Sequence, residues 1–309
     1  MPQMNPAQAR LIDPVLSTFA QGYSDPEFTG GLLFPAVPVD VAGGQVLEFG
    51  KEAFRRYSTQ RAPGAAIKRM QTGFLGRPYA LENHGFAGVV PVEIQRDALA
   101  VPGVDLGRRA MSGALAVVRR NLEAQQAAIA LDAANYDANH KIALTGAGKW
   151  SDPASKPITQ ISDYREAVRS SCGRYPNLAH FSAIGWQAFI NNPEVTDRIK
   201  HTQTGIVTEQ IAAVLLQVDR VVVGKAIYAD GADAFADIWG NSCVLAYTAL
   251  GSKEKEEPSY GYTYTLKGHP AVMQPWYDPD TNSWIYPALY ERLPVITQLG
   301  SAFLVQNPK

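Results

Sequence analysis

The chain has 309 residues, 46% of them hydrophobic and 18% charged, and its formal net charge is −1. This is enough apolar material for a sizeable core, and the near-zero charge argues against a dedicated nucleic-acid-binding protein, which usually carries a basic excess. The chain has two cysteines, no signal-peptide pattern and no apolar run near the roughly 18 residues that a membrane helix needs. We therefore expect a soluble intracellular protein without a disulfide framework.

The first segment, residues 1–42, is predicted to be an extended arm. An Asp-Pro-Glu run at residues 25–27 predicts the start of a helix, and X-Pro pairs at 34–35 and 37–38 require extended backbone soon afterwards. An apolar segment of this kind has too little surface to fold alone. We expect it to lie on the body of its own subunit or on a neighbouring one.

Residues 43–80 are predicted to form a long two-stranded hairpin, with a turn-prone run at 61–66. Its acids are Glu48 and Glu52, and its bases are Lys51, Arg55, Arg56, Arg61, Lys68, Arg69 and Arg77. An isolated hairpin is only marginally stable in water. Two interpretations remain open: a solvated hairpin whose charges maintain solubility, or one ordered across another copy of the chain. In the second, Arg55, Arg56, Arg61, Lys68 and Arg69 would meet acids of that copy.

The run from Asp105 to Asp132 is the longest helical pattern in the sequence. Apolar residues recur every fourth position from Leu106 to Leu122, and Asp105 is a suitable N-cap. Roughly 28 residues make a helix about 42 Å long, far beyond the average of a globular domain. We expect a spine with sheets laid on it, a surface pair between Arg119 and Glu123, and a core face formed by Leu115, Val118 and Leu122.

The remaining chain predicts a compact α/β region followed by a β-rich end. Residues 139–157 are polar and glycine-rich, and they mark the expected domain boundary. The α/β region that follows contains helix caps, a glycine at Gly173 that ends a helix, and β-branched runs that predict buried strands. From about Ser259 the pattern is that of strands, with a turn at residues 278–283 and a last strand in the run AFLVQN. The helices predicted here begin at Ser162, Ser182, Asn192 and Thr208. The fold class is therefore an elongated α+β protein.

Motifs that could carry chemistry are incomplete. The run at 146–149, GAGK, lacks the first glycine and the final Ser or Thr of a phosphate-binding loop. Asp278, Asp280 and Asn282 imitate a calcium loop, but its sixth and twelfth positions are Ser283 and Leu289, and a hairpin turn explains the same residues. The histidines are far apart in sequence, and neither cysteine lies in a CxxC motif. We expect no catalytic site, no cofactor and no metal.

The order of these parts resembles the major capsid protein of tailed bacteriophages, the Hong Kong ninety-seven type of fold. The runs FAQGYSDPEFTGGLLFPAVPV and GGQVLEFGKEAFRRYSTQRAPGAA are similar to the arm and the extended loop of phage shell proteins. The similarity continues in YPNLAHFSAIGWQAFINNPEVTDRIKHTQTG, VDRVVVGKAIY, IWGNSCVLAYT and PSYGYTYTL. The resemblance covers nearly the whole chain in a consistent order, although no single motif is diagnostic.

The resemblance implies a division of the chain. Residues 1–42 would be the N-terminal arm, 43–84 the extended loop (E-loop), 85–140 the peripheral domain with the spine helix, 141–258 the axial domain, and 259–309 the C-terminal strands of the peripheral domain. Axial domains would meet around five-fold and six-fold axes, and peripheral domains near three-fold positions. The turn with Asp278, Asp280 and Asn282 would be the three-fold contact.

The resemblance also implies a function. The chain would assemble into pentamers and hexamers of an icosahedral head that encloses double-stranded DNA, built in the bacterial host cytoplasm. One member of the family cross-links its shell through a lysine and an asparagine, but no motif here matches the partner residues of Lys51 or Lys68, so we predict non-covalent closure. Its partners would be copies of itself, a separate scaffolding protein, a portal and, in some heads, a decoration protein. The low net charge fits a shell that holds DNA without sequence-specific contacts. Two alternatives remain: an encapsulin-type nanocompartment that encloses an enzyme cargo, and a soluble α+β enzyme.

Overall fold

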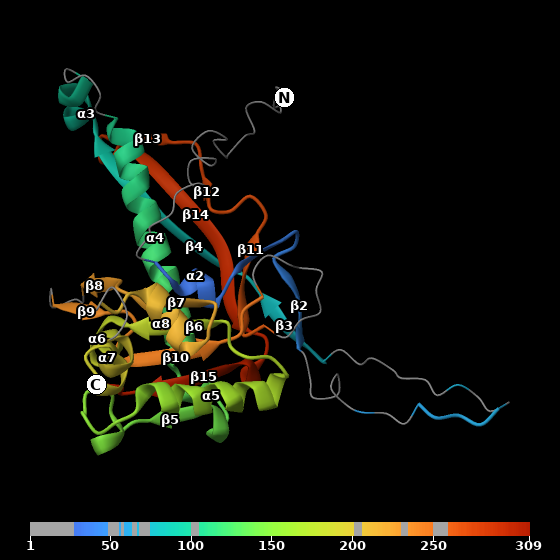
Figure 1. Cartoon of the computed structure of the whole chain (residues 1–309). Coiled ribbons are helices and arrows are strands. Elements are labelled where there is room, and N and C mark those ends of the chain that lie inside the picture. Colours follow the sequence, from blue (N-terminus) through green and yellow to red (C-terminus); the bar gives the residue numbers. More distant parts are fainter. Residues whose placement is uncertain are drawn as a thin grey trace.

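A computed structural model describes residues 28–48, 56, 59–63, 67, 75–99, 105–200, 206–229, 234–249 and 259–309. The molecule is elongated, with a long sheet at one end and an α/β body at the other (Figure 1). The helix α4, Leu106–Leu131, runs along the sheet and ends at the α/β body. In the described part, no helix is long and apolar enough to span a bilayer.

The predicted spine is present as α4, whose 26 residues make a rod about 39 Å long. Its N-cap is Asp105, whose side chain accepts a hydrogen bond from the backbone N–H of Arg108 at 3.0 Å. The residues that α4 buries are Met111, Ala114, Leu115, Val118, Glu123, Gln126, Ala127 and Ala130. The first half of this face contacts the long sheet, and the second half contacts the α/β body.

Leu122 differs from the prediction, because its side chain is only half-buried. Four residues turn a helix by about 400°, so a strict fourth-residue repeat drifts by about 40° at each step. From Leu106 to Leu122 the drift is large enough to leave the core face. Glu123, one position further on, takes the buried place that was predicted for Leu122.

The long sheet has six strands in the order β1-β11-β14-β12, and β4 and β13 also pair with β14. Their bounds are β1 Ala36–Val39, β4 Glu82–Pro91, β11 Gly261–Leu266, β12 Ala271–Val272, β13 Trp276–Asp278 and β14 Ser283–Ile296. Met111, Ala114 and Leu115 of α4 pack on Val272 and Ala288 of this sheet. The spine therefore lies against the C-terminal strands, as the sequence predicts.

The α/β body contains a five-stranded sheet in the order β5-β15-β10-β6-β7. Its strands are β5 Lys141–Ala143, β6 Leu178–Ser182, β7 Arg220–Gly224, β10 Ser242–Ala246 and β15 Ala302–Gln306. Its helices are α5 Pro157–Cys172, α6 Ala183–Ile190, α7 Pro193–Ile199 and α8 Glu209–Leu216. A large hydrophobic cluster that includes Trp150, Phe181 and Phe189 packs between these helices and the sheet.

The position of β15 corrects the predicted division of the chain. Residues 302–306 lie between β5 and β10 in the α/β body, whereas the sequence prediction grouped them with the C-terminal strands of the other sheet. Four of the five residues of β15 are buried, which is typical of a central strand covered on both faces. Such a run carries no alternation that identifies its sheet.

The start of the α/β body also differs in detail from the prediction. Residues 139–157 are integrated into this body, because they supply β5 and the fully buried Trp150. The helix expected from Ser162 begins five residues earlier, at Pro157, where proline occupies the first turn. Gly173 ends it as predicted, with a φ of 72° that glycine adopts without strain.

Shorter elements complete the described chain. The hairpin β2 Gly43–Glu48 and β3 Leu75–Ala80 forms a separate two-stranded sheet, as does the pair β8 Ile227–Ala229 and β9 Phe235–Asp237. Two short helices are α2 Gly30–Leu33 and α3 Val92–Leu99. Single 3₁₀ turns lie at Ala133–Asn135, Ala138–His140, Gly146–Gly148 and Leu299–Ser301.

Candidate assembly surfaces and the junction that positions them

A buried carboxylate joins the arm to the spine. Glu123 of α4 is only 2% exposed. Its carboxylate accepts hydrogen bonds from the backbone N–H of Thr29 at 2.9 Å and of Gly30 at 2.9 and 3.0 Å. The indole Nε1 of Trp239, in the turn before β10, donates to the same carboxylate at 2.7 Å. One side chain therefore fixes α2 and the α/β body to the spine.

Other polar side chains extend this junction. The Thr29 hydroxyl and the Nε2 atom of His180 on β6 lie 2.8 Å apart and share a hydrogen bond. Gln126 of α4 donates to the Thr263 hydroxyl at 2.9 Å, and that hydroxyl donates to the backbone carbonyl of Phe34 at 3.0 Å. The junction therefore joins the arm, the spine and both large sheets.

Burial controls the charge states at the junction. Burial raises the pKa of the Glu123 carboxyl, while the hydrogen bonds from Thr29, Trp239 and Gly30 oppose that shift. Burial lowers the pKa of His180 to about 3, so its imidazole is neutral near pH 7.

The expectation of a surface pair between Arg119 and Glu123 is wrong, because Glu123 is buried. One signal in the sequence indicates that Glu123 lies on the buried face of the helix. Glu123 lies four and seven residues before the small apolar residues Ala127 and Ala130, on their face of the helix.

The hairpin is the first candidate assembly surface. Its base is held to the long sheet by a stacked pair of rings, Tyr79 of β3 and Tyr264 of β11, with centroids 4.8 Å apart. Arg56 and Arg61 are exposed, and residues 59–63 lie far from the body (Figure 1). The other predicted contact residues of the hairpin, Arg55, Lys68 and Arg69, fall outside the described residues.

The turn after β13 is the second candidate surface. The Asp278 carboxylate accepts from the backbone N–H of Asp280 at 3.1 Å and from the Thr281 hydroxyl at 2.8 Å. Asn282 accepts from the Tyr277 hydroxyl at 2.6 Å and donates to the Glu93 carboxylate at 2.6 Å. Asp278 and Asn282 therefore shape the turn, while Asp280 is exposed at its tip.

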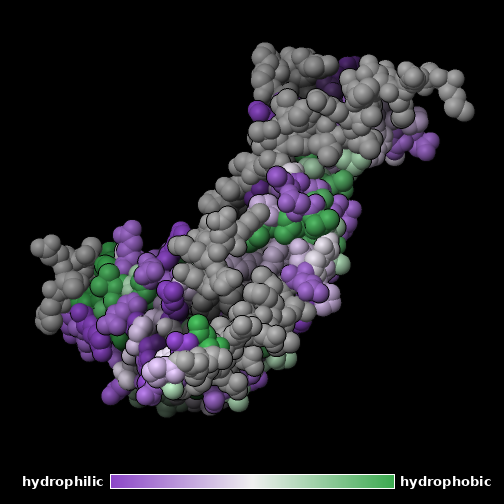
Figure 2. Space-filling view, turned by 90° about the vertical axis from the view of Figure 1, so that its right-hand side faces the viewer, coloured by the Kyte–Doolittle hydropathy of each residue, from purple (hydrophilic) through white to green (hydrophobic). Residues whose placement is uncertain are grey.

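Apolar side chains cross the outer face of the long sheet beside this turn. Trp276, Ile285 and Val89 are register neighbours on three adjacent strands. Trp276 is 47% exposed and Val89 is 55% exposed. Figure 2 shows hydrophobic residues on the sheet-bearing half of the molecule and a second group on the other half. These exposed apolar side chains make the face a candidate contact surface.

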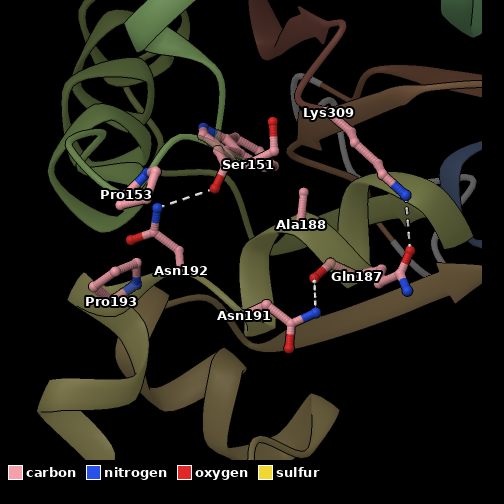
Figure 3. Close-up of a pocket in the computed structure, with 9 residues that line it drawn as sticks. Ser151, Pro153, Gln187, Ala188, Asn191, Asn192, Pro193 and Lys309 are labelled. Carbon is pink, nitrogen blue, oxygen red and sulfur yellow. Dashed lines mark hydrogen bonds between the residues drawn. The ribbon is translucent and has the colours of Figure 1, made fainter.

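A hollow of about 330 Å³ lies in the α/β body, between the loop at 150–153, α6, the start of α7 and Lys309 (Figure 3). The side-chain amide of Asn192 donates to the carbonyls of Trp150 and Asp152 and to the Ser155 hydroxyl, at 2.9–3.2 Å. Lys309 donates to the Gln187 side chain at 3.0 Å. These contacts brace the loop against the helices.

Candidate chemical sites are absent from the described part of the chain. No group of three His, Cys, Asp or Glu side chains there is arranged to hold a metal ion. The run GAGK at residues 146–149 is not expected to bind phosphate. It forms a 3₁₀ turn at Gly146–Gly148, close in sequence to the buried Trp150.

An elongated subunit with a spine helix, a projecting hairpin and two separately packed bodies is the architecture of a shell-forming protein of the Hong Kong ninety-seven type. The encapsulin SrpI of Synechococcus elongatus shares this fold, with a TM-score of 0.55, coverage of 92% of this chain and 88% of that one, and 11% identity. At this low sequence identity, the similarity supports a shared fold and nothing more.

Closer relatives define the family. The chain is 35% identical over 271 residues to the major capsid protein of Burkholderia phage BcepMu, covering 86% of this chain and 87% of that protein. A crystal structure of a phage-related protein from Bordetella bronchiseptica matches with a TM-score of 0.84 and 38% identity, covering 97% and 99%. Residues 132–248 match the family model described as phage major capsid protein E. The chain belongs to this family of phage major capsid proteins.

Membership of the family establishes the role. The protein is the major capsid protein of a tailed-phage head, a structural component of the virion that assembles with copies of itself, and it is not an enzyme. The similarity to phage capsid proteins, at 35% identity over most of the chain, decides against the encapsulin-type alternative.

Proposed function

We propose that copies of this chain form the pentamers and hexamers of an icosahedral head that encloses packaged double-stranded DNA. The observation that carries the proposal is the projecting hairpin, whose far residues are exposed and lie away from the body. A two-stranded hairpin is marginal in water on its own. Contact with a neighbouring copy would supply the burial that its own subunit does not give.

The two bodies have different places in this assembly. We assign the five-stranded sheet and its helices, now including β15, to the axial domain around the five-fold and six-fold axes. The six-stranded sheet and most of α4 are the peripheral domain, and the E-loop predicted at residues 43–84 ends before β4 begins at Glu82. Residues 1–42 are the N-terminal arm, anchored to the spine where Thr29 meets Glu123.

Specific side chains would make the contacts. On the hairpin these are the cations Arg55, Arg56, Arg61, Lys68 and Arg69, which would meet acids of the next copy. Of the predicted three-fold residues, Asp278 and Asn282 hold the turn in shape. Asp280, exposed at the tip, is the residue left to face a neighbouring copy.

The further partners follow from the same proposal. A separate scaffolding protein would guide closure in the host cytoplasm, a portal would occupy one vertex, and a decoration protein could bind outside. Packaged DNA would be held loosely and without sequence-specific contacts. A net charge of −1 fits a shell that does not grip the phosphate backbone. Closure would be non-covalent.

Deleting residues 52–72 tests the proposal. The deletion variant and the parent would be expressed with and without scaffolding protein and imaged by cryo-electron microscopy. We expect closed icosahedral shells from the parent, and open sheets or unassembled subunits from the variant. The melting temperature of the unassembled subunit serves as the control for folding. Shells of parental stability from the variant would show that the hairpin is not a main clamp between subunits.

A further inference from the structure

The strand pair β8–β9, residues 227–229 and 235–237, projects from the side of the α/β body that lies away from β2 and β3 (Figure 1). Its base is fixed in the core, because the backbone N–H of Ile238 donates to the carbonyl of Ala226 at 3.0 Å and both residues are buried. In the part of the chain that the structure describes, the two strands pair only with one another. The pair is therefore firmly rooted, but no other strand supports it.

Large apolar side chains of the β8–β9 pair are exposed. Phe235 is 75% exposed, Ile227 is 47% exposed and Tyr228 is 42% exposed. A single exposed apolar side chain is common on protein surfaces, but here these three lie together on two strands of three residues each. A two-stranded sheet is marginally stable in water on its own. Contact with another surface would cover these side chains and stabilise the pair.

The register distributes these side chains over both faces of the pair. The cross-strand partners are Ile227 with Asp237, Tyr228 with Ala236, and Ala229 with Phe235. Successive side chains of a strand point to opposite faces. Ile227, Ala229 and Phe235 therefore share one face, here called the Phe235 face. Tyr228 and Ala236 share the other, here called the Tyr228 face. Covering both faces requires a neighbour on each side.

A second copy of this chain is the occupant that fits both faces. The protein assembles with copies of itself, and each subunit of a closed ring meets one neighbour on each side through two different surfaces. A specific interface needs roughly 800 Å² from each partner, and two such short strands supply only part of this. A separate protein bound here alone would therefore be held weakly. In the assembly proposed above, neighbouring copies also meet over the rest of the α/β body, so the strand pair adds to a larger contact.

We propose that the β8–β9 pair forms a head-to-tail contact within the pentamer and hexamer rings, in which the Phe235 face of one copy packs on the Tyr228 face of the next. Phe235 is the anchor of this contact, because buried aromatic side chains carry much of the binding energy of an interface. The proposal rests on the assembly described above. It adds the side chains that join neighbouring copies and the direction in which they meet.

Introduced thiols test that direction. Ala229→Cys places a thiol on the Phe235 face and Ala236→Cys places one on the Tyr228 face, and both keep the large apolar side chains. Cys172 and Cys243 are buried, so they should not react. After mild oxidation of assembled shells, we expect the double variant to give a ladder of disulfide-linked chains that ends at the pentamer and the hexamer on a denaturing, non-reducing gel. Each single variant is a matched control and should run as a monomer.

Phe235→Ser measures how much the contact contributes. Phe235 is largely exposed in the subunit, so the melting temperature of the unassembled subunit should not fall. The subunit concentration needed for shell formation should rise about tenfold, as loss of an aromatic anchor at an interface implies. Val214→Ser is the matched control, because Val214 is 78% exposed on α8 of the same body. It should change neither quantity.

Several outcomes would overturn the proposal. Disulfide-linked dimers from a single variant would show that like faces meet across a two-fold axis. Closed shells without disulfides from the double variant would show that the pair faces solvent or a different protein, while the assembly itself would stand. A lower melting temperature for Phe235→Ser, or equal effects of Phe235→Ser and Val214→Ser on shell formation, would remove Phe235 as the anchor. Absence of shells from the parent would reject the assembly and this contact with it.

Discussion

Glu123 shows how much one side chain determines in this subunit. Its carboxylate collects N–H donors from the arm and from the turn before β10, and all of these groups are buried. A buried carboxylate is costly unless such donors satisfy it, and donors buried without an acceptor are costly in turn. The carboxylate and its donors therefore depend on one another, and the arm is held at a defined place on the spine.

Glu123→Gln should destabilise the subunit by about 1–3 kcal/mol, because an amide removes one acceptor and points N–H groups at other donors. Calorimetric unfolding of the unassembled subunit measures this. Glu166→Gln is the control, since Glu166 forms an exposed pair with Arg169 and exposed pairs contribute little to stability. Equal effects from both substitutions would contradict the role of Glu123 as an anchor.

His180 should make the subunit sensitive to acid. Its pKa falls from 6.5 in the unfolded chain to about 3 in the folded one, so below pH 6.5 the unfolded state binds the extra proton. The stability that this group contributes is complete above pH 6.5 and is lost progressively as the pH falls toward 3. The raised pKa of Glu123 has the opposite effect. At pH values just above the ordinary Glu range, the folded state binds the extra proton at Glu123, so this group adds stability as the pH falls.

Urea unfolding at pH 7 and pH 5 checks the prediction for His180. The parent should lose stability on acidification, and His180→Gln should lose clearly less, because glutamine keeps a polar contact for Thr29 but does not titrate. The same pH dependence in both proteins would remove His180 from the explanation.

At the scale of elements, α4 shows what local sequence predicts and what it does not. Its N-cap and its length follow from Asp105 and from the apolar period, which are local signals. Which residues it buries depends on two different partners, the long sheet for Leu115 and the α/β body for Ala127. A single stripe drawn along the helix therefore identifies the first half of the buried face and misses Glu123 in the second half.

Charges placed along α4 should separate these positions. Val118→Asp puts an unpaired carboxylate into a fully packed site and should cost more than about 3 kcal/mol, enough to prevent soluble expression. Leu122→Asp should be milder, because Leu122 is half-buried, and Arg120→Asp milder still. Soluble yield and circular-dichroism melting rank the three. A folded Val118→Asp subunit would place the buried face elsewhere.

At the scale of the whole molecule, the difficult predictions are the long-range pairings. The hairpin, the spine and the strands after Ser259 are recognisable from their turns and periods. The placement of β15 beside β5 and β10 joins segments more than 50 residues apart, and no local pattern in its five residues indicates those partners. The same holds for the junction of Thr29 with Glu123, and for Arg292, whose burial depends on strands brought together from both ends of the chain.

Removing residues 302–309 should prevent folding, because it takes a central strand out of the five-stranded sheet and exposes β5 and β10. Removing Lys309 alone is the control and should leave a soluble subunit, since β15 is retained. Solubility and the melting temperature after expression decide the matter. A folded subunit without residues 302–309 would contradict the central position of β15.

The position of β15 also determines when the subunit can finish folding during synthesis. The ribosome makes the arm, hairpin and spine first, but the sheet of the α/β body cannot close until residues 302–306 have emerged, because they fill the gap between β5 and β10. A nascent chain therefore presents its hairpin well before this body is complete. The α/β body of each subunit is therefore completed only after translation has passed the final strand.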